Sequence, residues 1–168
     1  GIIYGYIGEP AYAPYINKSV IVCPAYHPYF YDTSLSYPER RCYGRKRCYT
    51  HPGTSGIGTG TMISDYVRLT GMACPESFWY WADSICLNPS NVCYKSQYYT
   101  LDYQGSGQTY VHFRHQGRVN LLFVDGHVES VNQARFREIN LVHSAVTANT
   151  NDDWYIIDEK YNKIFIPG

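Results

Sequence analysis

Two turn signals, separated by one strand length, organise residues 109–131 and constrain the fold more than any other feature of the sequence. Gln116-Gly117 interrupts a β-prone segment, and Asp125-Gly126, a strong hairpin signal, closes the apolar run that follows. Glycine readily adopts a positive φ, so Asp125-Gly126 fits a type I′ turn. We therefore predict a three-stranded antiparallel meander with strands at Thr109–His115, Val119–Val124 and His127–Val131.

The rest of the chain contains short elements between segments rich in proline and glycine. Residues 26–60 carry so many of these two residue types that a helix cannot propagate through them. Residue patterns instead predict a helical turn at Ala11–Ile16, strands at Ser19–Val22, Met62–Leu69, Phe78–Ala82 and Tyr98–Tyr103, a helix at Asn132–Val142, and a hairpin of Trp154–Ile157 with Lys163–Ile166. We expect one α+β domain over residues 1–168, with an antiparallel sheet and a C-terminal hairpin within 147–168.

Composition excludes several classes of protein. The 168 residues have no net formal charge, and 17% are aromatic, including 19 tyrosines. This excludes a disordered chain and argues against general nucleic-acid binding, which needs a positively charged surface. No apolar run approaches the ~20 residues of a membrane helix, and no signal-peptide pattern is present. The chain begins with Gly1 rather than Met, which indicates a mature or truncated start.

Six cysteines occur without a Cys-X-X-Cys pair, a pattern that favours disulfide bonds in an oxidising compartment over a zinc site. Disulfide bonds would hold the long loops of about the first hundred residues in place. The alternative is that the cysteines are free thiols. Nearness in sequence favours two local pairs and leaves two cysteines over. The local pairs are Cys42–Cys48 and Cys86–Cys93, and the remaining two are Cys23 and Cys74.

The predicted meander carries a specific motif, in which His115 is followed by nine residues and then by Asp125-Gly126. With Asn120, Phe123 and His127, the pattern resembles the H-X9-DG domain of bacterial prepilin-type proteins, which are related to type II secretion pseudopilins. Upstream segments are similar to the same family. They are Pro14-Tyr15-Ile16 before Cys23-Pro24, and Cys74-Pro75-Glu76-Ser77 before Trp81-Ala82-Asp83-Ser84.

The resemblance, strongest over residues 109–131, implies a pilin-like α+β domain and no enzymatic activity. Such proteins resemble structural subunits of extracellular filaments or pseudopili, so the implied partners are other copies of the chain at the bacterial cell surface. Family members begin with a leader and a long apolar helix, and contact with a membrane is expected only through such a helix. We expect that helix to be absent, cleaved or replaced in this chain. Abundant tyrosine fits subunit contacts. The alternative is a cell-surface module that binds glycans or other ligands on aromatic loops.

Histidine and aspartate near the motif raise the question of a metal site. A strand between the two turns would separate His115 from Asp125 by roughly 20 Å, so these residues cannot share one ion. His112 and His115 fall on opposite faces of a strand. An ion held at the turn by His127 and Asp125 is the alternative to a structural role. We interpret the motif residues as a structural turn and strand, namely His115, Asn120, Phe123, Asp125, Gly126 and His127.

Oxygen donors gather near the C-terminal end of the sequence, at Asn149, Asn151, Asp152, Asp153 and Asp158. The EF-hand spacing fails, because Trp154 stands where glycine is required and Lys160 stands where the bidentate glutamate belongs. Calcium in a loop of another kind remains open, with Asp152, Asp153 and Asp158 as candidate ligands. The alternative is a solvated turn, and we otherwise expect no cofactor.

Two further patterns and a set of absent motifs complete the sequence evidence. A basic run could grip single strands or acidic glycans, but the neutral chain favours a solvated loop between Cys42 and Cys48. The glycines of residues 53–60 lack the lysine of a phosphate-binding loop, and hydrolase motifs are absent. We interpret Asp83 as a turn cap rather than a base. The basic run comprises Arg40, Arg41, Arg45, Lys46 and Arg47, interleaved with Tyr43 and Tyr49.

Overall fold

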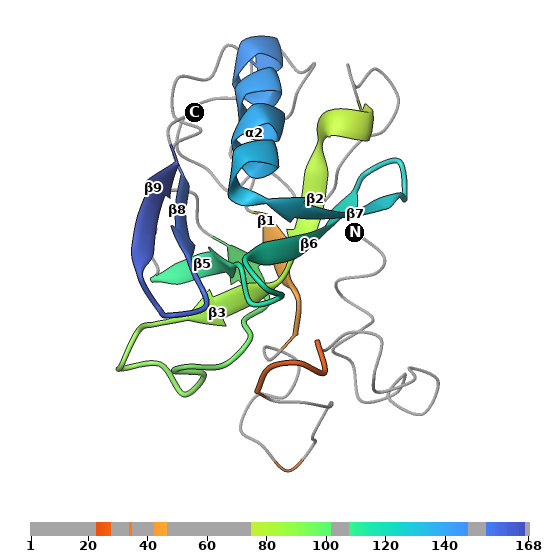
Figure 1. Ribbon diagram of the computed structural model, residues 1–168. Helices are drawn as coiled ribbons and strands as arrows, with labels where there is room; N and C mark the ends of the chain where they lie inside the picture. The colour runs from red at the N-terminus through yellow and green to blue at the C-terminus, as the bar shows by residue number, and fades with distance from the viewer. Residues whose placement is uncertain are drawn as a thin grey trace.

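In the part of the chain that the structure describes, two β-sheets and the helix α2 (Gln133–Thr147) enclose the core. The computed structural model describes residues 23–27, 34, 42–46, 75–101, 108–147 and 154–166. Within them, one sheet has the strand order β4-β1-β2-β6-β7 and the other β3-β5-β8-β9 (Figure 1). The elements are β1 (Gly44–Lys46), the 3-10 helix η3 (Pro75–Ser77), β2 (Trp79–Ala82), β3 (Ser84–Cys86), β4 (Thr100–Leu101), β5 (Thr109–His112), β6 (Arg118–Phe123), β7 (Val128–Asn132), α2 (Gln133–Thr147), β8 (Trp154–Ile157) and β9 (Lys163–Ile166).

Most strand pairs are antiparallel, as predicted for an α+β domain. In the five-stranded sheet, β2 pairs antiparallel with both β1 and β6, β6 with β7, and β1 lies parallel to β4. In the four-stranded sheet, β5 pairs antiparallel with β3 and parallel with β8, which forms a hairpin with β9. The predicted strand Phe78–Ala82 and both strands of the C-terminal hairpin are confirmed. The elements predicted within residues 11–22 and 62–69 lie outside the described residues.

The predicted meander is right for one hairpin and wrong for the other. β6 and β7 pair from Arg118↔Asn132 to Leu122↔Val128, but β5 pairs with β3 and β8 in the other sheet. The reason lies at Asp83, between β2 and β3. Its N–H donates to the Asn120 carbonyl in β6 (3.3 Å), and its carbonyl accepts the His112 N–H from β5 (2.9 Å). The chain passes from one sheet to the other at Asp83, between β2 and β3, and again between β5 and β6. The hydrogen bonds of Asp83 hold these two crossings next to each other.

Both predicted turns form, but the type I′ geometry predicted for Asp125-Gly126 is found at Gln116-Gly117 instead. Gln116 and Gly117 have φ values of 55° and 72°, and His115 and Arg118 exchange both backbone hydrogen bonds at 3.1 Å, as in a type I′ turn. At Asp125-Gly126 only the glycine has a positive φ, of 98°. This second turn is therefore the longer form, a type I turn followed by a left-handed glycine, and not the predicted type I′ turn.

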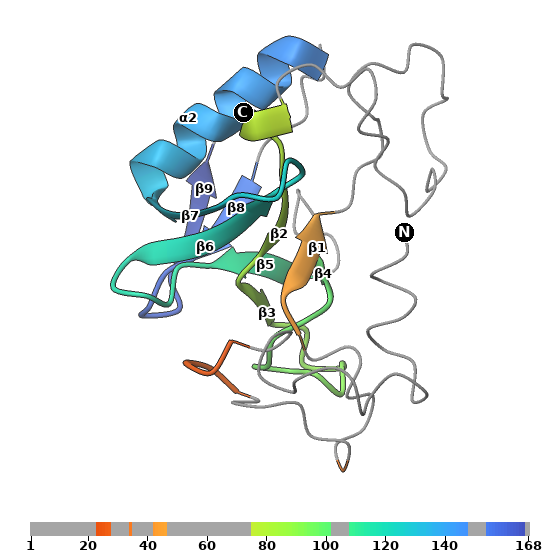
Figure 2. The same ribbon diagram turned by 90° about the vertical axis from the view of Figure 1, so that its right-hand side faces the viewer.

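The helix α2 covers a core rich in aromatic side chains, and Figure 2 shows the helix lying along one side of the two sheets. It is longer than the predicted Asn132–Val142, and the Asn132 side chain accepts the Arg135 N–H at 2.9 Å, which caps its first turn. Within α2, Phe136 and Ile139 are buried, whereas Ala134 and Leu141 are exposed. In the described residues, no helix is long and apolar enough to cross a membrane. The core joins residues of both sheets and the helix, among them Trp79, Phe113, Val119, Leu121, Phe136 and Trp154.

Gly44 in β1 marks a point where strands pack too closely for a side chain. A Cβ there would lie 2.6 Å from both the Leu101 Cγ and the Ser84 Cβ, closer than real Cβ contacts. We expect Gly44→Ala to lower the free energy of unfolding by about 1–3 kcal/mol, because β1 must move away from its neighbours. Urea denaturation measures the change, with the exposed Lys160→Ala as control. Equal stability of the two variants would show that β1 moves without cost.

Candidate functional site

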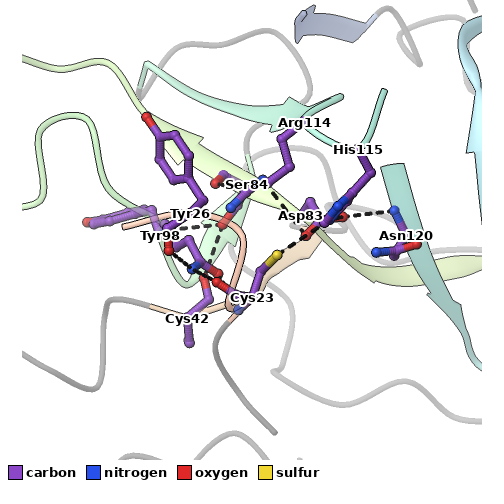
Figure 3. Close-up of polar contacts among 10 residues, drawn as sticks. Cys23, Tyr26, Cys42, Asp83, Ser84, Tyr98, Arg114, His115 and Asn120 are labelled. Carbon is purple, nitrogen blue, oxygen red and sulfur yellow. Dashed lines mark hydrogen bonds and ion pairs between the residues drawn. The ribbon is translucent and has the colours of Figure 1, made fainter. Parts of the chain in front are cut away.

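The carboxylate of Asp83 lies where the two sheets separate, and its side chain is fully buried. Its Oδ2 atom accepts the Asn120 backbone N–H at 2.9 Å and lies 3.3 Å from the His115 Nε2, while its Oδ1 lies 3.9 Å from the Arg114 Nε (Figure 3). Burial alone would raise the pKa of Asp83. The hydrogen bond from His115, the charge of Arg114 and the Asn120 N–H together outweigh burial and lower this pKa. Asp83 is therefore a buried carboxylate that stays ionised.

Arg114 supplies the positive charge of the site. Its side chain is 3% exposed, one guanidinium nitrogen donates to the Ser84 carbonyl, and the guanidinium lies 4.7 Å from the centre of the Tyr26 ring. Burial lowers the pKa of Arg114, and Asp83 opposes this shift. Arginine remains charged in proteins, so Arg114 and Asp83 form a buried pair of opposite charges.

Cys23 reaches the same point from the N-terminal side of the chain. It is 1% exposed, and its Sγ lies 3.4 Å from the His115 Nε2. The buried Gln97 fixes this segment, because its side chain accepts the Cys23 N–H (2.9 Å) and donates to the carbonyls of Cys23 (2.8 Å) and Tyr26 (3.0 Å). Burial, and then the charge of Asp83, raises the pKa of the Cys23 thiol.

Tyr43, just before β1, lies beside Cys23 and is half-buried. Burial raises the pKa of its hydroxyl, and the neighbouring Cys23 and Asp83 raise it further. The phenol therefore stays protonated and offers a hydrogen-bond donor next to the sulfur.

The three side chains Cys23, Asp83 and His115 form one cluster. Their sulfur, oxygen and nitrogen atoms all lie within 4.8 Å of one another. The sulfur and the carboxylate both face Nε2 of His115, whereas a nucleophile–base–orienter relay uses both nitrogens of the ring. The arrangement therefore suits a hydrogen-bonded structural centre or a set of metal ligands better than a catalytic triad.

The motif residues divide between this cluster and the β6–β7 turn. His115 and Asn120 contact Asp83, whereas Asp125 accepts the His127 N–H (3.1 Å) and lies 2.6 Å from its Nδ1. The His127 ring stacks on Phe123, with 4.1 Å between ring centres. The hydrogen bond from the His127 backbone lowers the pKa of Asp125. His115 and Asp125 lie at opposite ends of β6, as predicted.

The disulfide prediction is wrong for the cysteines that the structure describes. These are buried thiols, so they give no support for an oxidising compartment. The predicted partners Cys48 and Cys74 lie outside the described residues. The buried thiols are Cys23, Cys42, Cys86 and Cys93.

Backbone hydrogen bonds close the loop that the predicted Cys86–Cys93 bond would have closed. The Cys86 N–H donates to the Ser96 carbonyl (3.0 Å), and the Lys95 N–H donates to the Cys86 carbonyl (2.8 Å). Cys93 lies earlier, in the turn, where its N–H donates to the Asn91 side chain at 2.9 Å. The residues opposite Cys86 are therefore Lys95 and Ser96, and Cys93 is out of register with it.

The other candidate sites are only partly described. Asp158 accepts hydrogen bonds from the backbone of Lys160 and Asn162 and from the Asn162 side chain, each at 2.8 Å, and so stabilises the β8–β9 turn. The remaining predicted calcium ligands, Asp152 and Asp153, lie outside the described residues, as do the glycines of 53–60.

The predicted solvated loop between Cys42 and Cys48 instead contains strand β1, in which Gly44 and Lys46 are buried. Lys46 in β1 is 4% exposed, and its Nζ lies 4.8 Å from the Trp79 ring centre, 5.1 Å from that of Phe78 and 5.4 Å from that of Trp154. Aromatic rings attract a cation through their faces, which explains how this ammonium group is accommodated in the core.

Sequence reasoning missed two residues that build the site. Arg114 is part of the motif segment, but nothing in its spacing indicates a buried charge. Gln97 carries no signal in the sequence at all, and its role depends on the fold that brings it to Cys23. The sequence predicts a turn cap at Asp83, whereas the Asp83 carboxylate lies buried between β2 and β3 and accepts the Asn120 N–H.

A comparison of the sequence with protein-family models, with curated proteins and with solved structures gives no match. Function is therefore inferred from the geometry of the chain itself.

Proposed function

We propose that this chain is a pilin-like structural subunit of an extracellular bacterial filament or pseudopilus, assembled through contacts between its own copies. The observation that carries the proposal is the meeting of Cys23, Asp83 and His115, which come from three separate segments that resemble prepilin-type proteins. A chance resemblance would scatter such residues over the fold. Their contact at one buried point supports a single folded unit of that kind.

Open sheet edges support assembly between copies. Among the described residues, β9 pairs only with β8, and β7 pairs only with β6. Phe165 in β9 is 48% exposed and Val128 in β7 is 66% exposed. An edge with unpaired backbone groups and exposed apolar side chains can accept a strand of another chain. We propose that a second copy pairs along β9.

The tyrosines fit the same role. Tyr110 is the one buried tyrosine in the described part of the chain, and Tyr94 and Tyr161 are exposed. Tyrosine buries a large area at an interface while keeping a polar group, so exposed tyrosines suit contacts between subunits.

The shared His115 nitrogen supports a structural role over a catalytic one. A catalytic histidine would receive a proton from the nucleophile at one nitrogen while a partner orients the other. In this cluster, Cys23 and Asp83 compete for the same nitrogen. The cluster links the segment that carries Cys23 to both sheets.

We expect the purified chain to form oligomers or fibres as its concentration rises. Phe165→Lys should weaken this self-association by about tenfold or more, because it places a charge at the proposed strand contact. Light scattering measures the association, and electron microscopy shows any fibres. Circular dichroism of the variant checks that the fold is retained.

Leu141→Lys is the matched control, since Leu141 is 43% exposed but lies on α2 and not on a strand edge. It should associate as the unchanged chain does. A chain that stays monomeric at every concentration and forms no fibres would contradict the proposal. If that monomer binds a sugar on a glycan array, the alternative of a surface binding module is favoured.

A further inference from the structure

Cys23, Asp83 and His115 direct one sulfur, one oxygen and one nitrogen atom at a common point (Figure 3). The Cys23 Sγ lies 3.4 Å from the His115 Nε2, which lies 3.3 Å from the Asp83 Oδ2. Bonds of about 2.0–2.3 Å to a tetrahedral zinc ion place neighbouring ligand atoms about 3.3–3.6 Å apart. The two measured separations are those expected of ligands around one such ion.

Neighbouring groups hold the ligand atoms in place. Asp83 is fixed by the Asn120 N–H and by Arg114, and the backbone of Cys23 is fixed by Gln97. Hydrogen bonds of this kind orient metal ligands and contribute strongly to affinity. The three side chains therefore do not need to move far to bind an ion.

The charges of the cluster favour a divalent cation. A thiolate at Cys23 and the carboxylate of Asp83 would bring two negative charges to the ion, against the one positive charge of Arg114. Arg114 lies 3.9 Å from Oδ1, the carboxylate oxygen that does not face His115. Its positive charge is therefore directed at one oxygen, while Oδ2 faces the other two ligand atoms.

The types of donor atom select the metal. Ca²⁺ and Mg²⁺ take oxygen ligands, whereas a set of sulfur, imidazole nitrogen and carboxylate oxygen suits Zn²⁺. The His115 side chain is 28% exposed, so solvent reaches this side of the cluster. We propose that Cys23, Asp83 and His115 bind one Zn²⁺ ion, with a water molecule as the fourth ligand.

Metal titration of the chelator-treated full chain tests this proposal, with Zn²⁺ or Co²⁺ alone as the probe. We expect one high-affinity ion per chain by calorimetry, a rise in melting temperature with Zn²⁺, and a thiolate-to-Co²⁺ charge-transfer band. Cys23→Ser should abolish that band, and His115→Gln should weaken binding by about tenfold to a hundredfold. Circular dichroism shows whether each of these two variants folds, and one folded variant is enough for the test.

His127→Gln is the matched control, because His127 also lies beside a carboxylate but contacts neither Cys23 nor Asp83 in the described structure. It should bind both metals as the unchanged chain does. The proposal is overturned if Co²⁺ gives no thiolate band. It is equally overturned if Cys23→Ser and His115→Gln, folded, bind as tightly as the control, since the metal would then sit on other residues.

Discussion

Replacing Asp83 by alanine should lower the free energy of unfolding by about 3–5 kcal/mol. The substitution leaves the Arg114 guanidinium, 3% exposed, without its nearest opposite charge. It also removes the acceptor of the Asn120 N–H at the point where the two sheets separate. A buried charge and a buried backbone donor would then both lose a partner, and each loss is costly. Urea denaturation at neutral pH, with a chelator present to exclude any metal contribution, measures the effect.

A second substitution separates the charge from the packing. Arg114→Met in the Asp83→Ala background removes the orphaned cation, so the double variant should be more stable than the sum of the two single losses predicts. Glu138→Ala is the control, since it removes an exposed carboxylate from its pair with Arg135 and should change stability by less than about 0.5 kcal/mol. If Asp83→Ala were no more damaging than this control, the buried pair would have no structural role.

The parts of the fold that sequence predicts well are those fixed by neighbours along the chain. The hairpins β6–β7 and β8–β9 form where turn residues interrupt β-prone runs, and Asn132 caps α2 as its residue type allows. The strands that pair with β5 could not be predicted from neighbouring residues along the chain. It is decided by Asp83, which bonds to β5 and β6 from a distant segment and so directs them into different sheets.

The candidate site also depends on contacts between residues that are distant in the sequence. Cys23, Asp83 and His115 were each noted in the sequence, but 92 residues separate Cys23 from His115, and no local pattern shows that they meet. The disulfide prediction failed for a related reason. Spacing along the chain gives no information on register, and the loop after β3 places Lys95 and Ser96, not Cys93, opposite Cys86.

His112 should make the fold sensitive to mild acid. It is 2% exposed and lies edge-on to the Tyr26 ring and beside that of Tyr161. Burial, and then the charge of Arg114, lowers the pKa of His112 from 6.5 to about 3, although the charge of Asp83 and the nearby Asp158 backbone oppose the shift. Its imidazole therefore stays neutral in the folded protein well below the pH at which it protonates in the unfolded chain.

The lowered pKa fixes the direction of the pH effect. Above pH 6.5 neither state binds the proton, so His112 does not make stability depend on pH there. As the pH falls below 6.5, His112 binds a proton in the unfolded chain but not in the folded protein. The free energy of unfolding therefore decreases until the pH reaches about 3. The full loss is about 4–5 kcal/mol, of which about 2–3 kcal/mol falls between pH 7 and 4.5. The pKa of Asp83 is lowered from its ordinary value of 3.8, so Asp83 affects stability only below about pH 3.8, outside the interval from pH 7 to 4.5.

Urea denaturation at several values between pH 7 and 4.5 tests the expectation. His112→Gln cannot take up the proton, so its free energy of unfolding should change by about 2–3 kcal/mol less over this interval than that of the unchanged chain. His127→Gln leaves the buried His112 in place, so this variant should still lose stability on acidification. If the His112→Gln curve instead runs parallel to that of the unchanged chain, His112 accepts its proton in the folded state, and the acid sensitivity originates in other groups.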